Sequence, residues 1–360
     1  MKKITGRSAF LSILQSEGVT HLFGNPGTTE LPIMHALKEY PDIKYILGLQ
    51  EAIVVAMADG YSRATGKLSA CNVHVAPGLG NAMGAIYNAK FVGSPIIITA
   101  GQQEQGHGLM EPMLYGPLVR MAEPLVKWAT EVNRLEDLPR IMRRAAKIAL
   151  SPPTGPVFIS LPGDILNKEA KIDLGKSTRV IDTYRPSHNS IELIAKKLSK
   201  YKKPVIIAGH EVATSGAFKE ITMFAEYTGS AVYQQTVPHG SHYPSEHMAF
   251  MGTLPRLQKP TKNILENYDL LICVGCDGLR MSVWSDTEPL PSKMPIIHIG
   301  INEWEIGKNY STELAIIGNV KNTLNDINQY LKNTLTPEET LKAKKRLELI
   351  AKNNWNVKKK

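Results

Sequence analysis

The sequence lacks the features that mark membrane and secreted proteins. No apolar run approaches the roughly 18 residues of a membrane span, and the first 15 residues contain no hydrophobic block followed by a small-residue cleavage site. Three cysteines in 360 residues do not make a disulfide framework. We therefore expect a cytoplasmic protein with no membrane partner.

The body of the chain also lacks a basic stripe interleaved with aromatic residues, which a nucleic-acid surface needs. The formal net charge is +9, but much of the excess lies in residues 341–360, which are typical of a solvated basic helix and tail. We expect no nucleic-acid partner.

Two groups of potential metal ligands have ordinary structural explanations. Cys273 and Cys276 form a C-x-x-C, but an apolar strand pattern surrounds them and no second ligand pair of matching type follows. His239, His242 and His247 lie among prolines and glycines that indicate a loop. We interpret both groups as packing residues and predict no metal site in this chain.

Short apolar runs alternate with helical periods along the chain, which predicts an α/β fold made of two Rossmann-like, doubly wound parallel-sheet domains. The predicted strands of the first domain are 19–24, 43–49, 68–75, 94–101 and 155–162, and those of the second are 203–210, 230–237, 269–276 and 294–301.

The pattern divides the chain into four parts. Residues 1–165 form the first domain, a polar stretch at 166–188 reads as a linker, residues 189–332 form the second domain, and residues 333–360 form a helix and basic tail. The last helix has a clear start, because Thr336 can cap it, Pro337 suits its first position and Glu339 completes a capping box.

In an open α/β sheet, ligands bind beyond the carboxyl ends of the strands, so the residues there are candidates for a site. Glu51 stands out, because a carboxylate in an otherwise apolar stretch is costly unless a partner holds it. Its alternative role is to stabilise the start of its own helix. His74, taken alone, is better explained as a core histidine.

The segment from Asn72 to Gly84, NVHVAPGLGNAMG, raises the question of a dinucleotide fingerprint. The pattern G-x-G-x-x-G needs a third glycine where Met83 stands, so the spacing misses by one residue. The glycines can instead allow the backbone to approach a flat cofactor ring.

Five ordered stretches carry a resemblance to a known family: FGNPGTTELP, LQEA, ADGYSRATGK, HVAPGLGNAMGAIYNA and SPIIITAGQQ. They resemble the N-terminal, pyrimidine-binding domain of thiamine-diphosphate-dependent enzymes, and most resemble the benzoylformate decarboxylase branch. The second domain resembles, more loosely, the central domain of that family.

The resemblance implies roles for individual residues. Glu51 matches the glutamate that forms a hydrogen bond with a ring nitrogen of the cofactor's pyrimidine. His74 matches a histidine that transfers protons beside the substrate. Thr28 falls where that branch carries a serine that contacts the substrate carboxylate, and its extra methyl narrows the site. The remaining cofactor-binding positions that we carry over are Asn25, Pro26, Gly27, Pro77, Gly78 and Asn81.

The resemblance also implies a reaction, the non-oxidative decarboxylation of a 2-oxo acid, in a homo-oligomer. The family's third domain, which binds the diphosphate through Mg²⁺, has no counterpart here, because GCDG at 275–278 lies at a strand end and no paired asparagines follow. We expect the chain alone to be inactive and to need such a domain, as part of a longer product or as a separate chain. The alternatives are an acetolactate synthase-like carboligase, with FAD as a less favoured second cofactor, and a non-catalytic cofactor-binding or assembly module.

Overall fold

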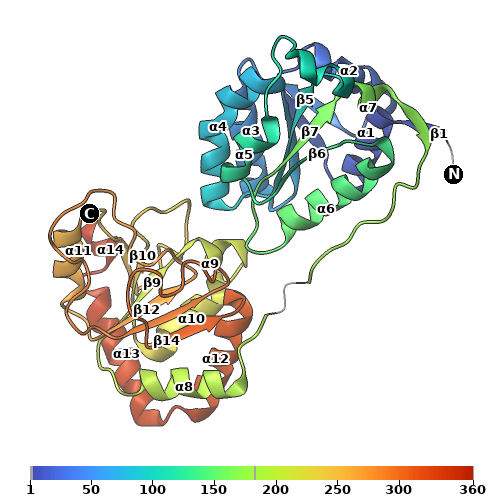
Figure 1. The fold of residues 1–360 in the computed structure, drawn as a ribbon. Coiled ribbons are helices and arrows are strands. Elements are labelled where there is room, and N and C mark those ends of the chain that lie inside the picture. The colour runs from blue at the N-terminus through green and yellow to red at the C-terminus, as the bar shows by residue number, and fades with distance from the viewer. Residues whose placement is uncertain (1–2, 182–183, 360) are drawn as a thin grey trace. The chain divides into compact units, whose positions relative to one another are not determined.

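The computed structural model describes residues 3–181 and 184–359, which form two compact units, Met1–Ile181 and Asp182–Lys360. Each unit contains its own parallel six-stranded sheet with helices on both faces (Figure 1). The predicted fold class, two doubly wound α/β domains, is therefore confirmed. Within the described residues, no helix is both long and apolar enough to cross a membrane.

The sheet of the first unit has the strand order β3-β2-β4-β5-β7-β6, with every neighbouring pair parallel. Its strands are β2 (His21–Gly24), β3 (Lys44–Leu47), β4 (Ser69–Val73), β5 (Ile96–Gln102), β6 (Ala129–Glu131) and β7 (Val157–Pro162). The central strands β4, β5 and β7 are buried throughout, as expected for a sheet that is covered on both faces.

Helices cover both faces of this sheet (Figure 1), and each face has its own hydrophobic core. One face packs against α1 (Gly6–Ser16), α2 (Leu31–Ala36), α6 (Leu138–Leu150) and α7 (Gly163–Asn167). The other packs against α3 (Glu51–Thr65), α4 (Val75–Val92) and α5 (Leu118–Ala122). Short 3-10 turns lie at Thr28–Glu30, Leu37–Glu39, Gln105–Met110, Glu123–Leu125 and Leu135–Asp137.

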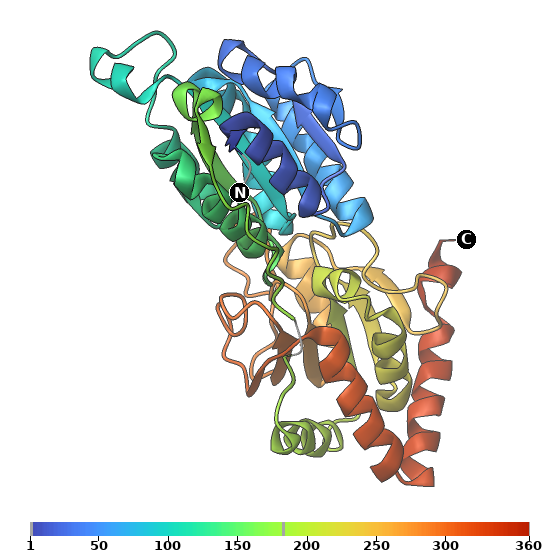
Figure 2. The same cartoon turned by 90° about the vertical axis from the view of Figure 1, so that its right-hand side faces the viewer.

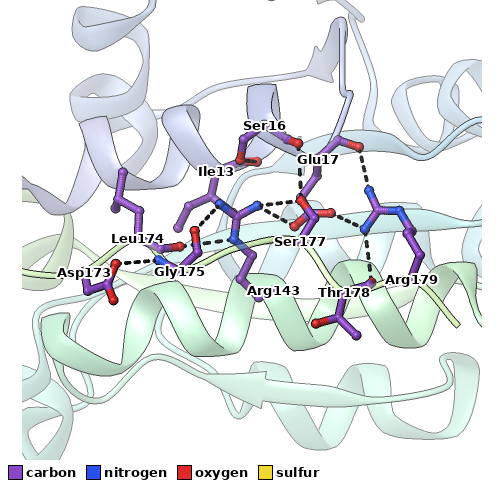
Figure 3. Close-up of polar contacts among 10 residues, drawn as sticks. All are labelled: Ile13, Ser16, Glu17, Arg143, Asp173, Leu174, Gly175, Ser177, Thr178 and Arg179. Atoms are coloured by element: carbon purple, nitrogen blue, oxygen red, sulfur yellow. Dashed lines mark hydrogen bonds and ion pairs between the residues drawn. The ribbon is translucent and has the colours of Figure 1, made fainter.

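The segment predicted as a linker, 166–188, is in part built into the first unit. Strand β8 (Glu169–Lys171) pairs antiparallel with β1 (Lys3–Thr5). Farther along, Arg143 of α6 donates to the backbone carbonyls of Leu174 and Gly175, while the buried Glu17 forms ion pairs with both Arg143 and Arg179 (Figure 3). These polar contacts hold residues 174–179 against α1 and α6, which the sequence pattern did not indicate.

The second unit has the strand order β11-β10-β9-β12-β13-β14, again parallel throughout. Its strands are β9 (Pro204–Ala208), β10 (Ala231–Gln234), β11 (Phe250–Thr253), β12 (Leu270–Val274), β13 (Ile296–Gly300) and β14 (Leu314–Ile317). Its helices are α8 (His188–Leu198), α9 (His210–Thr214), α10 (Phe218–Thr228), α11 (Gln258–Leu265), α12 (Val320–Thr334), α13 (Pro337–Ala351) and α14 (Trp355–Lys358).

The C-terminal helix belongs to the second unit and does not stand apart as a tail. Helices α12 and α13 form a hairpin in this unit (Figure 2), and the predicted capping box of Thr336 and Glu339 begins α13. The Arg346 side chain donates to the carbonyl of Thr228 at 2.7 Å, and Ala343 and Leu347 are buried.

Within the two six-stranded sheets, the sequence analysis did not predict strands β6, β11 and β14, which lie at sheet edges. They have three or four residues each and are only partly buried, so they carry little of the apolar signal on which the prediction depends. A further difference concerns the end of the third predicted strand, 68–75. Strand β4 ends at Val73, and Val75 is already the first residue of α4.

Candidate active site

The candidate site lies at the carboxyl edge of the first unit's sheet, where the chain order reverses. From β2 the chain passes to β3 on one side, whereas β4 lies on the other side of β2. Loops after neighbouring strands diverge at such a switch point and leave a crevice for a ligand. The residues that follow β2 and β4, Asn25 and His74, begin these loops.

A buried carboxylate occupies this edge. Glu51 is 7% exposed and is the first residue of α3. The Asn25 side-chain amide donates to its Oε1 at 3.2 Å, and the Asn81 amide donates to its Oε2 at 3.0 Å. Two donors and the positive end of a helix all favour negative charge at this position. The structure thus brings together three of the residues that the sequence analysis selected, from three separate segments.

Gly78 lies directly against this carboxylate. A Cβ built on Gly78 would lie 3.0 Å from Glu51 Oε1, so a larger side chain would displace the carboxylate or its amide donors. Gly80 and Gly84 differ, because an added Cβ there would meet nothing within 4 Å. Of these three glycines, Gly78 is therefore the one at which a side chain would clash with the candidate site.

His74 forms a second cluster, with a partner that the sequence analysis missed. Its Nδ1 lies 2.7 Å from Oε2 of Glu30, which is fully buried. Glu30 Oε2 also accepts the backbone N–H of Gly27 at 2.9 Å, and its Oε1 accepts the N–H of Gly101 at 2.8 Å and the Thr29 hydroxyl at 2.8 Å. With Nδ1 bound to this carboxylate, the half-buried imidazole can use Nε2 for proton transfer.

The backbone around His74 is tightly fitted. Built Cβ atoms on Gly27 would lie 2.2 to 2.4 Å from three atoms of the His74 ring, so the ring rests on a position where only glycine fits. Val75, the next residue, has φ of 41°, a left-handed conformation that a β-branched residue adopts only at a cost. This strained junction aims the imidazole toward the β2 loop.

Tyr45 of β3 lies near the same acid cluster. Burial, followed by the negative charge of Glu30, raises the pKa of its phenol well above the ordinary value. The hydroxyl therefore stays protonated, and it is a buried group without a hydrogen-bond partner in the described part of the chain. A Cβ on Gly24 would fall 1.9 Å from this hydroxyl, so Gly24 makes the room for it.

The other predicted site residues lie outside these two hydrogen-bonded clusters or at the surface. Thr28 is exposed, and no hydrogen bond joins its side chain to His74 or Glu51 among the described residues, whereas its neighbour Thr29 lies 3.3 Å from His74 Nδ1. Pro26 is half-buried beside Asn25, and Pro77 is exposed in the first turn of α4.

Two family models match this chain. Residues 4–113 match the thiamine pyrophosphate enzyme N-terminal TPP binding domain, and residues 191–327 match the central domain of the same enzymes. The chain belongs to the thiamine pyrophosphate enzyme family. Thiamine pyrophosphate is another name for thiamine diphosphate, so the resemblance drawn from the sequence motifs is confirmed at the level of the family.

Individual relatives come from both branches considered above. A benzoylformate decarboxylase of Pseudomonas aeruginosa is 31% identical over an alignment of 337 residues, which covers 92% of this chain and 63% of that protein. An acetolactate synthase large subunit of Haemophilus influenzae is 30% identical over an alignment of 367 residues, which covers 100% of this chain and 63% of that protein.

The fold has solved counterparts in the same family. The thiamine diphosphate-dependent 4-hydroxybenzoylformate decarboxylase of Rhodococcus jostii RHA1 superimposes with a TM-score of 0.84 at 31% identity, covering 93% of this chain and 63% of that one. In each of these comparisons, this chain spans less than two thirds of the relative's length.

The residues at the candidate site fit the pyrimidine half of the family cofactor. Glu51 offers a buried carboxylate acceptor, which suits a ring nitrogen, and Gly78 leaves open the space that a Cβ would fill beside it. The diphosphate half of the cofactor needs a metal ion. Among the described residues, no group of three or more His, Cys, Asp and Glu side chains is arranged to hold one.

In the second unit, the two cysteines and His242 are buried. Cys273 lies in β12 and Cys276 just beyond it, both buried and unpaired. Contact with Cys273, together with burial, raises the pKa of the Cys276 thiol well above its usual range, so it stays protonated and unreactive. His242 is 1% exposed in its loop, and burial lowers its pKa to about 4.

Proposed function

We propose that this chain supplies the pyrimidine-binding and central domains of a thiamine-diphosphate-dependent enzyme that decarboxylates a 2-oxo acid without oxidation. The observation that carries the proposal is the buried Glu51 carboxylate, held by Asn25 and Asn81 at the switch point of a domain that matches the family's cofactor-binding model. The alternative role of Glu51, helix capping alone, does not explain why two side-chain amides from other segments hold it.

Glu51 would accept a hydrogen bond from the pyrimidine ring and fix its orientation and protonation. Asn25 and Asn81 position the carboxylate for this task, and Pro26, Gly27, Pro77 and Gly78 form the backbone against which the ring would rest. When bound, thiamine diphosphate supplies the carbon nucleophile and the electron sink that decarboxylation needs.

His74 would carry out proton transfer at the substrate end of the site. Glu30 holds Nδ1, which leaves Nε2 to deliver a proton to the product carbon or to remove one from it. Thr28 is exposed at the same edge and would offer its hydroxyl to the substrate carboxylate. The diphosphate and its Mg²⁺ would be held by a further domain or a partner chain, in a homo-oligomer.

The test uses the enzyme complete with its diphosphate-binding part. Glu51→Gln keeps the size of the side chain and removes its charge, and we expect exchange of the thiazolium carbon proton, followed by NMR, to slow about a hundredfold or more. Glu123→Gln, an exposed acid of the same unit, is the matched control and should exchange at the wild-type rate. Wild-type exchange in Glu51→Gln would remove this residue from the role.

An acetolactate synthase-like carboligase is the second candidate, favoured by the 30% identity that extends over the whole chain. His74 favours the decarboxylase, since release of an aldehyde requires a proton at the product carbon. Product analysis separates the two. Benzoylformate should yield an aldehyde from a decarboxylase, whereas pyruvate should yield a longer hydroxy acid from a carboligase.

A further inference from the structure

A second pocket lies on the first unit, formed by α6 and the segment that follows β8. Its volume is about 510 Å³, within the range of about 300 to 1,000 Å³ that small-molecule sites occupy. Its walls include Pro139, Arg140, Arg143 and Arg144 of α6 and residues 171–176. None of these residues belongs to the candidate active site.

Four cations line this pocket without a counter-ion. Arg140, Arg144, Lys171 and Lys176 are exposed, and none forms an ion pair within residues 3–181 and 184–359. The Arg144 guanidinium lies over the Trp128 ring, with 5.8 Å between its guanidinium carbon and the ring centroid.

The two acids that line the pocket are already engaged. Glu136 lies 3.7 Å from Arg134 and 4.0 Å from Lys168, and Asp173 accepts the backbone N–H of Gly175 at 3.0 Å. Asp173 keeps its negative charge, because its partner is a neutral amide, but the four cations outnumber it and leave a net positive potential in the pocket. A concave surface of one charge concentrates the field and attracts ions of opposite sign.

Two of the arginines that line this pocket on α6 repel each other. Arg140 and Arg144 are four residues apart on α6, and like charges at this spacing destabilise a helix. The opposite wall is fixed by other contacts. Arg143, between these two arginines in sequence, binds the carbonyls of Leu174 and Gly175 (Figure 3), so the cations of the two walls face a preformed pocket.

We propose that this pocket binds a small anion with several negative charges, carried by phosphate or carboxylate groups. The guanidinium groups of Arg140 and Arg144 would bind it as forks from α6, and the ammonium groups of Lys171 and Lys176 would bind it from the facing segment. Binding joins α6 to residues 171–176 and tightens the segment that ends the first unit. The proposal is independent of the decarboxylase function.

The experiment uses the whole chain with pyrophosphate and citrate as probes, at constant ionic strength. Isothermal titration calorimetry compares the wild type with the double variant Arg140→Gln/Lys171→Gln, which removes one cation from each wall. Both side chains are exposed and unpaired, so the fold should persist. We expect binding to the double variant to be weaker by about tenfold or more.

The control is Lys344→Gln/Lys345→Gln on α13, which removes the same charge from exposed positions of the second unit. It should bind the anion as the wild type does. Hydrogen exchange gives a second reading, because the amides of residues 172–177 should gain protection when the anion binds.

The comparison of the two probes shows whether phosphate or carboxylate is the preferred group. Equal affinity in the two double variants would overturn the proposal, as would unchanged exchange at residues 172–177 with the anion bound.

Discussion

Glu30 and His74, 44 residues apart in the sequence, meet at 2.7 Å between Oε2 and Nδ1 at the carboxyl edge of the first sheet. The carboxylate is fully buried, while the imidazole is half-buried. This pairing orients the ring and leaves Nε2 as its reactive nitrogen. It makes Glu30 a positioning residue for the proposed proton transfer.

Glu30→Gln should destabilise the first unit. The two carboxylate oxygens accept backbone N–H groups from Gly27 and Gly101, so the amide of glutamine would turn a donor toward another donor. One buried unmade hydrogen bond costs about 1 to 3 kcal/mol, and we expect the free energy of unfolding to fall by this amount in urea titrations. Glu123→Gln, at an exposed position, should change it by less than about 0.5 kcal/mol.

His74→Ala separates a proton-transfer role from a packing role. If the ring transfers protons, turnover should slow by about a hundredfold or more while cofactor affinity stays within a few fold. A packing role predicts the reverse pattern, a lower melting temperature with turnover retained. Kinetics and melting curves on the same preparations check the prediction.

Gly27→Ala should damage activity more than Gly80→Ala does. The added methyl at Gly27 would meet the His74 ring at 2.2 Å, so the ring must move. At Gly80 the same methyl meets nothing within 4 Å, and alanine favours the helix by about 1 kcal/mol. Steady-state kinetics should show a loss for the first variant only, and thermal melting should show a gain in stability for the second.

The stability of the second unit should depend on pH through His242. Burial lowers its folded-state pKa from 6.5 to about 4, so between these pH values the unfolded chain binds a proton that the folded chain does not. The free energy of unfolding therefore falls as the pH drops through this window, by about 3 kcal/mol when the titration is complete. Burial also lowers the pKa values of His210 and His298, which act in the same direction.

The measurement is urea unfolding at several pH values between 4 and 7, followed by fluorescence. In a Trp128→Phe background the remaining tryptophans, Trp284, Trp304 and Trp355, all report on the second unit. His242→Gln should flatten the pH dependence. An equally steep dependence in this variant would assign the effect to other groups.

The sequence predicts the sheets well because their central strands are buried on both faces and read as continuous apolar runs. It also predicts that Glu51 needs a partner, since an acid interrupts an apolar stretch there, and the structure gives this carboxylate two amide donors. The sequence analysis did not select Glu30, because this residue follows two threonines and precedes Leu-Pro, a context typical of an exposed helix start. Its burial depends on β5 and on His74, contacts that no local pattern contains.

Contacts between residues that are distant in sequence also explain why the segment after β7 is ordered. Residues 166–179 are polar and weakly periodic, so the sequence suggests a linker. Ile172 is buried in the core of the first unit, but much of the segment's order comes from polar contacts with Glu17 and Arg143, which are distant in sequence. A hydrophobic pattern cannot reveal this kind of attachment.

The antiparallel pairing of β1 with β8 brings residues 3–5 beside residues 169–171. The entry and exit of the first unit's chain are therefore neighbours on one surface, and its core is complete between them. A short peptide can join these ends, and new termini can then be opened in an exposed loop such as 105–116. The unit is thus a natural candidate for circular permutation and for insertion into a host protein as a cassette.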